Sequence, residues 1–291
     1  MQLGLSTAAF YGRWETEESA AQMARWGVDC VEVFLETYSE YTRAFGSQVR
    51  RALCGIPCTS IHPQGTQFEN GLTGRSAKQR RDARDMLCRV LDAGQALGAH
   101  VYVCHGRHTA LLSPLPWDMQ ANADMLGIMG EEAAVRGMVI GWENVCWCQL
   151  TTPQRVEVAR QALPGLHFTL DIKQAMRAGC DPLDFVRAMG GGLCNVHVCD
   201  WDARGRLCLP GEGTFDFAAL CRALRRTGYD GPVIIEPYLA LIRSDEALLR
   251  SVAFMRRQIE EAEGESTEES AGRAECMENQ AAHIDENHPP E

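Results

Sequence analysis

The sequence predicts a (β/α)₈ barrel over residues 1–262, followed by an acidic tail over residues 263–291. Short apolar runs with strand character alternate with longer amphipathic runs, a pattern typical of parallel strands joined by crossover helices. Eight such strands fall within roughly 250 residues, as a closed (β/α)₈ barrel requires. An open doubly wound sheet is the alternative, but no G-x-G-x-x-G motif follows the first strand to support it.

Strands are expected where apolar, β-branched or aromatic residues form short runs. These runs are residues 2–7, 30–35, 58–63, 100–106, 138–144, 167–173, 194–200 and 232–238. Three of the intervening helices have clear boundary signals in the sequence. Residues 77–98 end at Gly98, residues 152–165 begin with Thr-Pro, and residues 244–262 begin with Ser-Asp-Glu.

The composition is that of an ordinary soluble globular protein, with 45% hydrophobic and 23% charged residues. No segment approaches the roughly 18–20 apolar residues of a membrane span, and the start MQLGLSTAAF lacks the basic and apolar regions of a signal peptide. The 13 cysteines are odd in number, and several lie in or beside apolar strands, which favours reduced thiols. We therefore expect a cytoplasmic protein with no membrane partner.

The net charge of −11 is concentrated at one end of the chain. Residues 260–291 contain eleven of the 39 acidic residues and a single base, Arg273, so the rest of the chain is nearly neutral. From about residue 264 onward, large apolar side chains are almost absent, and such a segment cannot bury enough surface to fold. We expect a solvated, disordered tail, with an acidic interaction arm as the alternative.

Polar side chains stand where the expected strands end, and the carboxyl ends of parallel barrel strands meet at one face. Strands five to eight end at Glu143, Asp171, His197 and Glu236. Three carboxylates without a cation would repel one another, whereas this oxygen-rich set with one imidazole suits Mn²⁺, Mg²⁺, Co²⁺ or Zn²⁺. The sequence therefore predicts one divalent metal ion held by these four side chains.

The stretch FTLDIKQ, residues 168–174, shows that a strand-end acid also has a simpler explanation. Such an acid can cap the following helix or pair with a base, and for Asp171 alone this is as good an explanation as metal binding. Suitable residues at the ends of four successive strands favour the metal site.

The segments GWENV, LDIKQAMRAG, NVHVCDWDARGRLCLPGEGTFDF and VIIEPY resemble the sugar phosphate isomerase/epimerase family, whose members have a xylose-isomerase-like TIM barrel. The resemblance covers residues 2–262 and points to the ketose 3-epimerase branch. It implies that Glu143, Asp171, His197 and Glu236 bind one divalent metal. It also implies that the two glutamates exchange the substrate proton, while it says little about which sugar is bound.

Proton exchange next to a ketone agrees with this division of roles. A metal that chelates the carbonyl and a neighbouring hydroxyl would stabilise an enediolate, and a positioned carboxylate would remove the proton. Return of the proton to the opposite face gives epimerisation, and its return to the neighbouring carbon gives aldose–ketose isomerisation. We expect Glu143 and Glu236 to be the acid–base pair, in either order.

Three positions depart from patterns found in the family. Gln174 stands where many members have a histidine, and a glutamine can bond a sugar hydroxyl but ligates metals poorly. Gly205 and Leu207 stand where the DNA-repair branch has an aspartate and a histidine, so the trinuclear zinc site of that branch cannot form. Because the nearly neutral barrel also lacks a basic surface, we expect no nucleic-acid partner.

Five side chains are predicted to bind the substrate: His62, His105, Lys173, Gln174 and Arg204. The two histidines could equally be packed strand-end residues. Lys173 shares the strand parity of Asp171 and could instead form a structural ion pair. Arg204 follows strand seven, where barrels often bind phosphate, and a solvated loop position is its alternative.

We therefore expect a metal-dependent enzyme that epimerises or isomerises a sugar or sugar phosphate. Two alternatives stay open: a metal-dependent dehydratase of the inosose type, and a non-catalytic barrel that binds a sugar or a partner subunit. Members of the resembled family are often dimers or tetramers. The sequence does not identify a subunit interface, so a homo-oligomer stays an open alternative.

Overall fold

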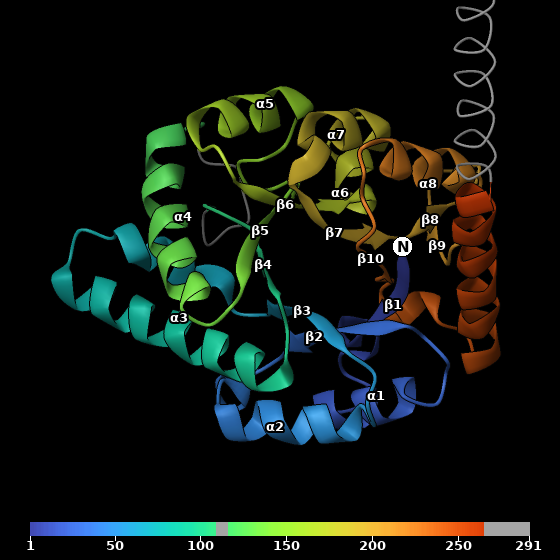
Figure 1. The fold of residues 1–291 in the computed structure, drawn as a ribbon, viewed down its shortest axis with the longest axis horizontal. Helices are drawn as coiled ribbons and strands as arrows, with labels where there is room; N and C mark the ends of the chain where they lie inside the picture. The colour runs from blue at the N-terminus through green and yellow to red at the C-terminus, as the bar shows by residue number, and fades with distance from the viewer. Residues whose placement is uncertain (109–115, 265–291) are drawn as a thin grey trace, which may run out of the picture.

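The computed structural model describes residues 1–108 and 116–264. Its centre is a closed barrel of parallel strands in the order β1-β10-β7-β6-β5-β4-β3-β2, which confirms the predicted (β/α)₈ fold (Figure 1). The first strand closes the barrel against the last, with Gln2 opposite Pro232. The barrel strands are β1 (Gln2–Ser6), β2 (Cys30–Leu35), β3 (Cys58–Pro63), β4 (Val101–Cys104), β5 (Val139–Glu143), β6 (His167–Asp171), β7 (Leu193–Val198) and β10 (Pro232–Ile235).

Helices surround the strands and form the outer layer (Figure 1). A final helix spans residues 245–264, and the Met1 ammonium lies 2.6 Å from Glu263 Oε1 on it. In the connection after β7, β8 (Asp200–Trp201) and β9 (Leu207–Cys208) form an antiparallel hairpin. The preceding α-helices are α1 (Thr16–Met23), α2 (Arg43–Ala52), α3 (Ala77–Leu97), α4 (Met119–Ala134), α5 (Pro153–Ala162), α6 (Ile172–Arg177), α7 (Pro182–Met189) and α8 (Phe217–Arg226).

Local signals set the helix ends much as predicted. α3 stops at Gly98, whose φ of 90° is left-handed and therefore suits glycine. α5 begins with Pro153 after Thr152, whose side chain accepts a hydrogen bond from the Arg155 amide. The helix is shorter than predicted because Leu163 already leaves the helical conformation.

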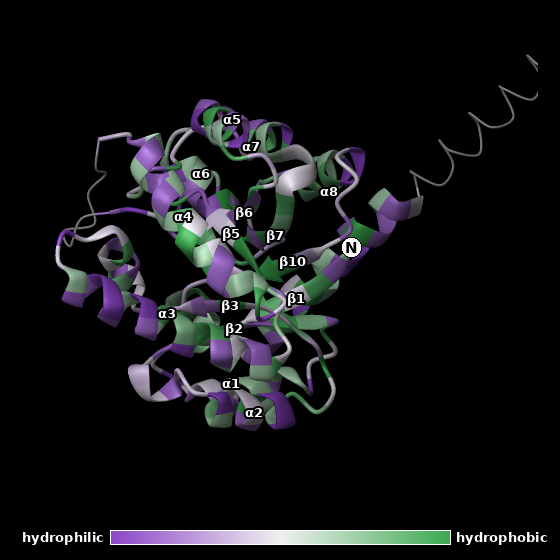
Figure 2. Cartoon of the chain, turned by 60° about the vertical axis from the view of Figure 1, so that its left-hand side comes forward, coloured by the Kyte–Doolittle hydropathy of each residue, from purple (hydrophilic) through white to green (hydrophobic). Residues whose placement is uncertain are grey.

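Hydrophobic and hydrophilic residues alternate around the helices (Figure 2), and buried apolar side chains form the core between strands and helices. The core includes Leu5, Val33, Tyr102, Phe168 and Leu220, all fully buried. The barrel interior differs from this layer, because it also contains buried polar residues. These include Ser6 at the end of β1 and Glu32, Ser60, Thr169 and Asn195 within their strands.

The cysteines of the described residues are all free thiols. Within the same residues, no helix is long and apolar enough to cross a membrane. The final helix continues two residues past the predicted boundary at residue 262, and the predicted acidic tail lies outside the described residues from residue 265 onward.

Two helical glycines provide a matched test of the helix packing. A β-carbon on Gly46 of α2 would lie 2.3 Å from the Ala93 carbonyl oxygen of α3, whereas one on Gly127 of α4 would meet no atom within 4 Å. We expect Gly46→Ala to lower the free energy of unfolding by about 1–3 kcal/mol through overpacking. Gly127→Ala should raise it by about 0.5–1 kcal/mol through helix propensity. Urea unfolding measures both, and a Gly46→Ala protein as stable as wild type would contradict the described contact.

Candidate metal centre

Four side chains from neighbouring strands converge at the carboxyl-end mouth of the barrel. Glu143 ends β5, Asp171 ends β6, His197 lies in β7 and Glu236 follows β10. One ligand atom each of Glu143, Asp171 and His197 lies within 4.8 Å of the other two. Glu236 Oε2 lies 3.4 Å from His197 Nδ1, so the fourth side chain borders the same point. The structure thus brings together the four residues predicted as metal ligands.

Three of the converging atoms are buried without a hydrogen bond. Glu143 Oε2, Asp171 Oδ2 and His197 Nδ1 have no hydrogen-bond partner among the described residues. Buried polar atoms are nearly always satisfied in folded proteins, since an unsatisfied one costs about 1–3 kcal/mol. Carboxylate oxygens with one imidazole nitrogen form a donor set for Mn²⁺, Co²⁺ or Zn²⁺, and for Mg²⁺ with more oxygen ligands. The residues present therefore fit one divalent cation.

The ionisation of the carboxyl groups reflects their crowding. Burial raises the pKa of Asp171, and the nearby carboxylates of Glu143 and Glu236 raise it further. The Lys173 ammonium opposes this rise in the pKa of Asp171 without cancelling it. Burial would also raise the pKa of Glu143, but the nearby imidazoles of His105 and His197 hold that pKa well below its usual value. A cation at the centre would relieve the repulsion that Asp171 experiences.

Lys173 enters the cluster from a helix rather than from a strand. The predicted strand ran to Lys173, but β6 ends at Asp171, because Asp171 Oδ1 accepts a hydrogen bond from the Gln174 amide and caps α6. Lys173 Nζ lies 3.2 Å from Asp171 Oδ2 and 3.0 Å from Glu236 Oε2. The predicted strand parity of Lys173 is therefore wrong, while the ion pair considered for it is present. One oxygen of Asp171 caps the helix, and the other faces the cluster, where metal binding stays a prediction.

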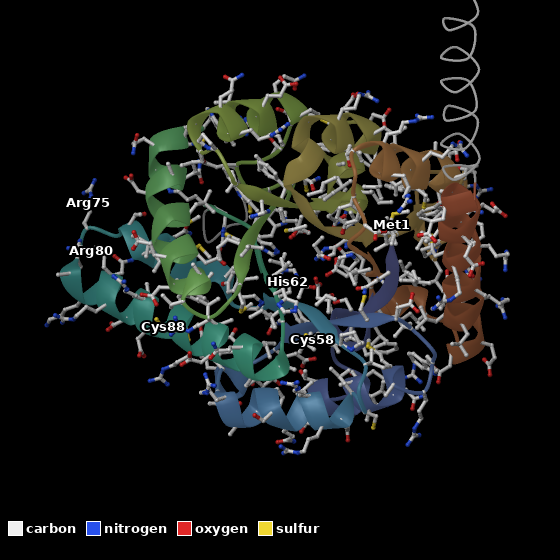
Figure 3. All side chains as sticks on the ribbon, in the orientation of Figure 1. Met1, Cys58, His62, Arg75, Arg80 and Cys88 are labelled. Atoms are coloured by element: carbon white, nitrogen blue, oxygen red, sulfur yellow. The ribbon has the colours of Figure 1, made fainter. Side chains whose placement is uncertain are left out.

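Two histidines border the cluster on the side of β3 and β4. His62 Nε2 lies 2.7 Å from His105 Nε2, and His105 Nε2 lies 3.1 Å from Glu143 Oε2. His62 Nδ1 is 3.6 Å from Glu236 Oε1. Figure 3 shows His62 near the middle of the ring of strands. Both histidines thus lie beside predicted ligands, and substrate binding stays a prediction for both.

The remaining two predicted substrate residues lie in different surroundings. Gln174 is 9% exposed, and its Oε1 accepts a hydrogen bond from the Cys146 amide at 3.4 Å. Arg204 is exposed in the turn between β8 and β9, where its amide donates to Asp202 Oδ1. Within the described residues, Arg204 forms no hydrogen bond or ion pair with the four predicted ligands. Its role therefore stays a prediction for a substrate that extends toward this hairpin.

Aromatic rings adjoin the charged cluster on several sides. The Phe34 ring lies 5.4 Å from His62, and the Trp147 ring lies 5.3 Å from His105. Tyr238 lies 5.2 Å from the Lys173 ammonium. Such apolar walls lower the local dielectric and offer flat faces to a ring-shaped substrate.

The loop after β7 is organised by Asp200, which the sequence analysis did not single out. Its carboxylate accepts hydrogen bonds from the amides of Trp201, Gly211, Gly213 and Phe215. A β-carbon on Gly213 would lie 2.2 Å from the Trp201 carbonyl oxygen, so the loop requires glycine there. The PGEG segment therefore shapes the connection that follows His197.

Glu32 was also missed, although it lies directly beside a predicted ligand. It is fully buried in β2, and its Oε2 lies 2.9 Å from His197 Nε2. The available signal was an acid in the centre of the apolar strand CVEVFL. An acid at such a position is uncommon unless it is paired.

Comparison with known sequences agrees with the barrel fold. A model of the xylose isomerase-like TIM barrel family matches residues 20–258. An uncharacterised protein of Mycobacterium tuberculosis is 34% identical over 291 residues, which cover 89% of this chain and 98% of the relative. The 3-dehydroshikimate dehydratase of Pseudomonas putida is 31% identical over 252 residues, which cover 81% of this chain but 38% of that enzyme.

Among solved structures, a D-psicose 3-epimerase is similar in fold, with a TM-score of 0.71. The match covers 89% of this chain and 99% of the epimerase at 18% sequence identity, so it speaks for the fold alone. The family model matches most of the chain and agrees with the closed parallel barrel. This chain therefore belongs to the xylose isomerase-like TIM barrel family.

Proposed function

We propose that this protein is a divalent-metal-dependent isomerase or epimerase of a sugar or sugar phosphate, with Glu143 and Glu236 as acid and base. The observation that carries the proposal is the placement of these carboxylates. Glu143 Oε1 and Glu236 Oε2 each lie 3.4 Å from His197 Nδ1. The fold likeness to ketose 3-epimerases supports the proposal.

The two glutamates would act on a hydrogen next to the substrate carbonyl. Glu143, Asp171, His197 and Glu236 would hold the cation, which when bound supplies positive charge to stabilise the enediolate oxygens. One glutamate removes the proton, and the other returns it to the opposite face of the same carbon or to the neighbouring carbon. The two are not equivalent, because Glu236 lies 3.0 Å from the Lys173 ammonium, whereas Glu143 lies beside the neutral or protonated imidazole of His105.

The remaining polar groups would bind and orient the substrate. His62 and His105 offer hydrogen-bond donors or acceptors to hydroxyl groups beside Glu143. Lys173 and Gln174 are both buried in α6, and the Lys173 ammonium lies 3.0 Å from Glu236 Oε2. Arg204 on the exposed hairpin would reach only a substrate that extends out of the mouth, such as a sugar phosphate.

A dehydratase acting on a cyclic polyhydroxy ketone is the second candidate function. Two relatives, at 31% and 28% identity over 81% and 82% of this chain, are 3-dehydroshikimate dehydratases. The same proton abstraction can expel a hydroxyl at the β-carbon instead of returning the proton. Product mass separates the two functions, because dehydration removes water whereas epimerisation and isomerisation leave the mass unchanged.

Replacing either glutamate by glutamine should remove proton exchange without unfolding the barrel. With Mn²⁺ present, we expect Glu143→Gln and Glu236→Gln to slow exchange of the substrate carbon-bound hydrogen with D₂O by at least about 100-fold. NMR of a panel of ketoses, ketose phosphates and inososes measures this exchange. Glu212→Gln is the control, since Glu212 is exposed in the loop after β7. Exchange at the wild-type rate in both variants would refute the assigned roles.

Divalent ions should stabilise the folded protein through the same cluster. At an ion concentration 100 times Kd, binding raises the free energy of unfolding by about 2.7 kcal/mol. We expect this gain in wild type and most of it to be absent in Asp171→Asn. Asp202→Asn, on the exposed hairpin, should keep the gain. Thermal unfolding of EDTA-treated protein with and without Mn²⁺ measures the effect, and a Tm independent of the ion would contradict the site.

A further inference from the structure

A layer of buried polar side chains lies next to the metal centre inside the barrel. Glu32 on β2 is its central member, and Ser6, Ser60 and Asn195 reach it from β1, β3 and β7. All four residues are fully buried. The interior of such barrels is usually filled by bulky branched apolar side chains. A carboxylate at this depth therefore calls for a specific explanation.

The donors around Glu32 identify what it does. Its Oε2 accepts from Ser60 Oγ at 2.7 Å and from Asn195 Nδ2 at 2.8 Å, and its Oε1 accepts from Ser6 Oγ at 3.3 Å. The remaining close neighbour is His197 Nε2, 2.9 Å from Oε2. An ionised carboxylate only accepts hydrogen bonds, so this contact requires a proton on the imidazole Nε2. Three donors thus surround Glu32 Oε2, while Oε1 accepts from Ser6 and lies 3.9 Å from His62 Nδ1.

Asn195 does not change this assignment, although its Nδ2 also lies 2.9 Å from His197 Nε2. Asn195 Nδ2, His197 Nε2 and Glu32 Oε2 form a nearly equilateral triangle. The two N–H bonds of an amide diverge too widely to point at both other corners. The charged carboxylate is the stronger acceptor, so the amide donates to Glu32. The imidazole Nε2–H then also donates to Glu32.

A proton fixed on Nε2 leaves Nδ1 as the nitrogen with a free lone pair. Nδ1 is the atom that lies 3.4 Å from both Glu143 Oε1 and Glu236 Oε2 and has no hydrogen bond among the described residues. A residue that accepts a hydrogen bond from the second ring nitrogen of a metal-ligating histidine fixes the orientation of the ring. It also makes the ligating nitrogen more basic. We infer that Glu32 is a positioning residue that presents His197 Nδ1 to the cation, an inference that rests on the metal site of the proposed function.

The test compares two fully buried glutamates with different surroundings. Glu32→Gln keeps the shape of the side chain but removes the charge that faces His197. Glu69→Gln is the matched control, because Glu69 is equally buried but accepts a hydrogen bond from the Tyr102 hydroxyl of β4 at 2.8 Å. Calorimetric titration with Mn²⁺ should give one ion per chain in all three proteins. We expect the affinity of Glu32→Gln to fall by about 10–100-fold and that of Glu69→Gln to stay within about threefold of wild type.

A second measurement needs no substitution and guards against misfolding of the variant. In ¹⁵N-labelled wild-type protein loaded with Zn²⁺, long-range NMR correlations should show His197 with a protonated Nε2 and a metal-bound Nδ1. Binding through Nε2, or an unchanged Mn²⁺ affinity in folded Glu32→Gln, would overturn the inference for Glu32. Failure of the wild-type protein to bind any ion would instead overturn the proposed function, so the two failures are distinguishable.

Discussion

The arrangement of the site depends on the balance of charge in a buried space. Glu32, Glu143, Asp171 and Glu236 are each at most 8% exposed and stand around one end of the barrel interior. Lys173 contributes one fixed positive charge, and neighbouring carboxylates hold its pKa well above the usual value despite the opposing effect of burial. Repulsion between carboxylates is strong where water is excluded. A divalent cation would bring the total charge of these side chains close to neutrality. Together with the three converging atoms that lack a hydrogen bond, this favours a metal ion at the site.

The barrel brings the carboxylates together, and it also supplies the hydrogen-bond donors that stabilise some of them. Glu32 and His197 are 165 residues apart in sequence, and only closure of the sheet makes them neighbours. Two serines and an asparagine from three other strands satisfy Glu32, and the Asp171 carboxylate divides its oxygens between a helix cap and the cluster. Asp200 binds the amides of the following loop, so the backbone beyond His197 is also fixed. The Glu32 carboxylate thus has donors from three strands, whereas Glu143 Oε2, Asp171 Oδ2 and His197 Nδ1 have no hydrogen bond among the described residues.

The fold and the convergence of the four predicted ligands could be predicted from the sequence, because both follow from parallel strands that end at one face of the barrel. Parallel strands end at one face, so Glu143, Asp171 and His197 had to meet once the barrel closed. The place of Lys173 could not be predicted as easily, because the helix cap formed by Asp171 ends the strand two residues early. Glu32 was missed because one acid in an apolar strand gives no hint of its partners, which come from three other strands. Asp200 was missed for a similar reason, since its four amide partners lie in an irregular loop.

Crystals soaked with Mn²⁺ and measured near the manganese absorption edge test the central claim most directly. The account predicts one anomalous peak per chain, within about 2.0–2.4 Å of oxygens of Glu143, Asp171 and Glu236 and of His197 Nδ1. A peak elsewhere in the molecule, or no peak among these four side chains at saturating Mn²⁺, would contradict it.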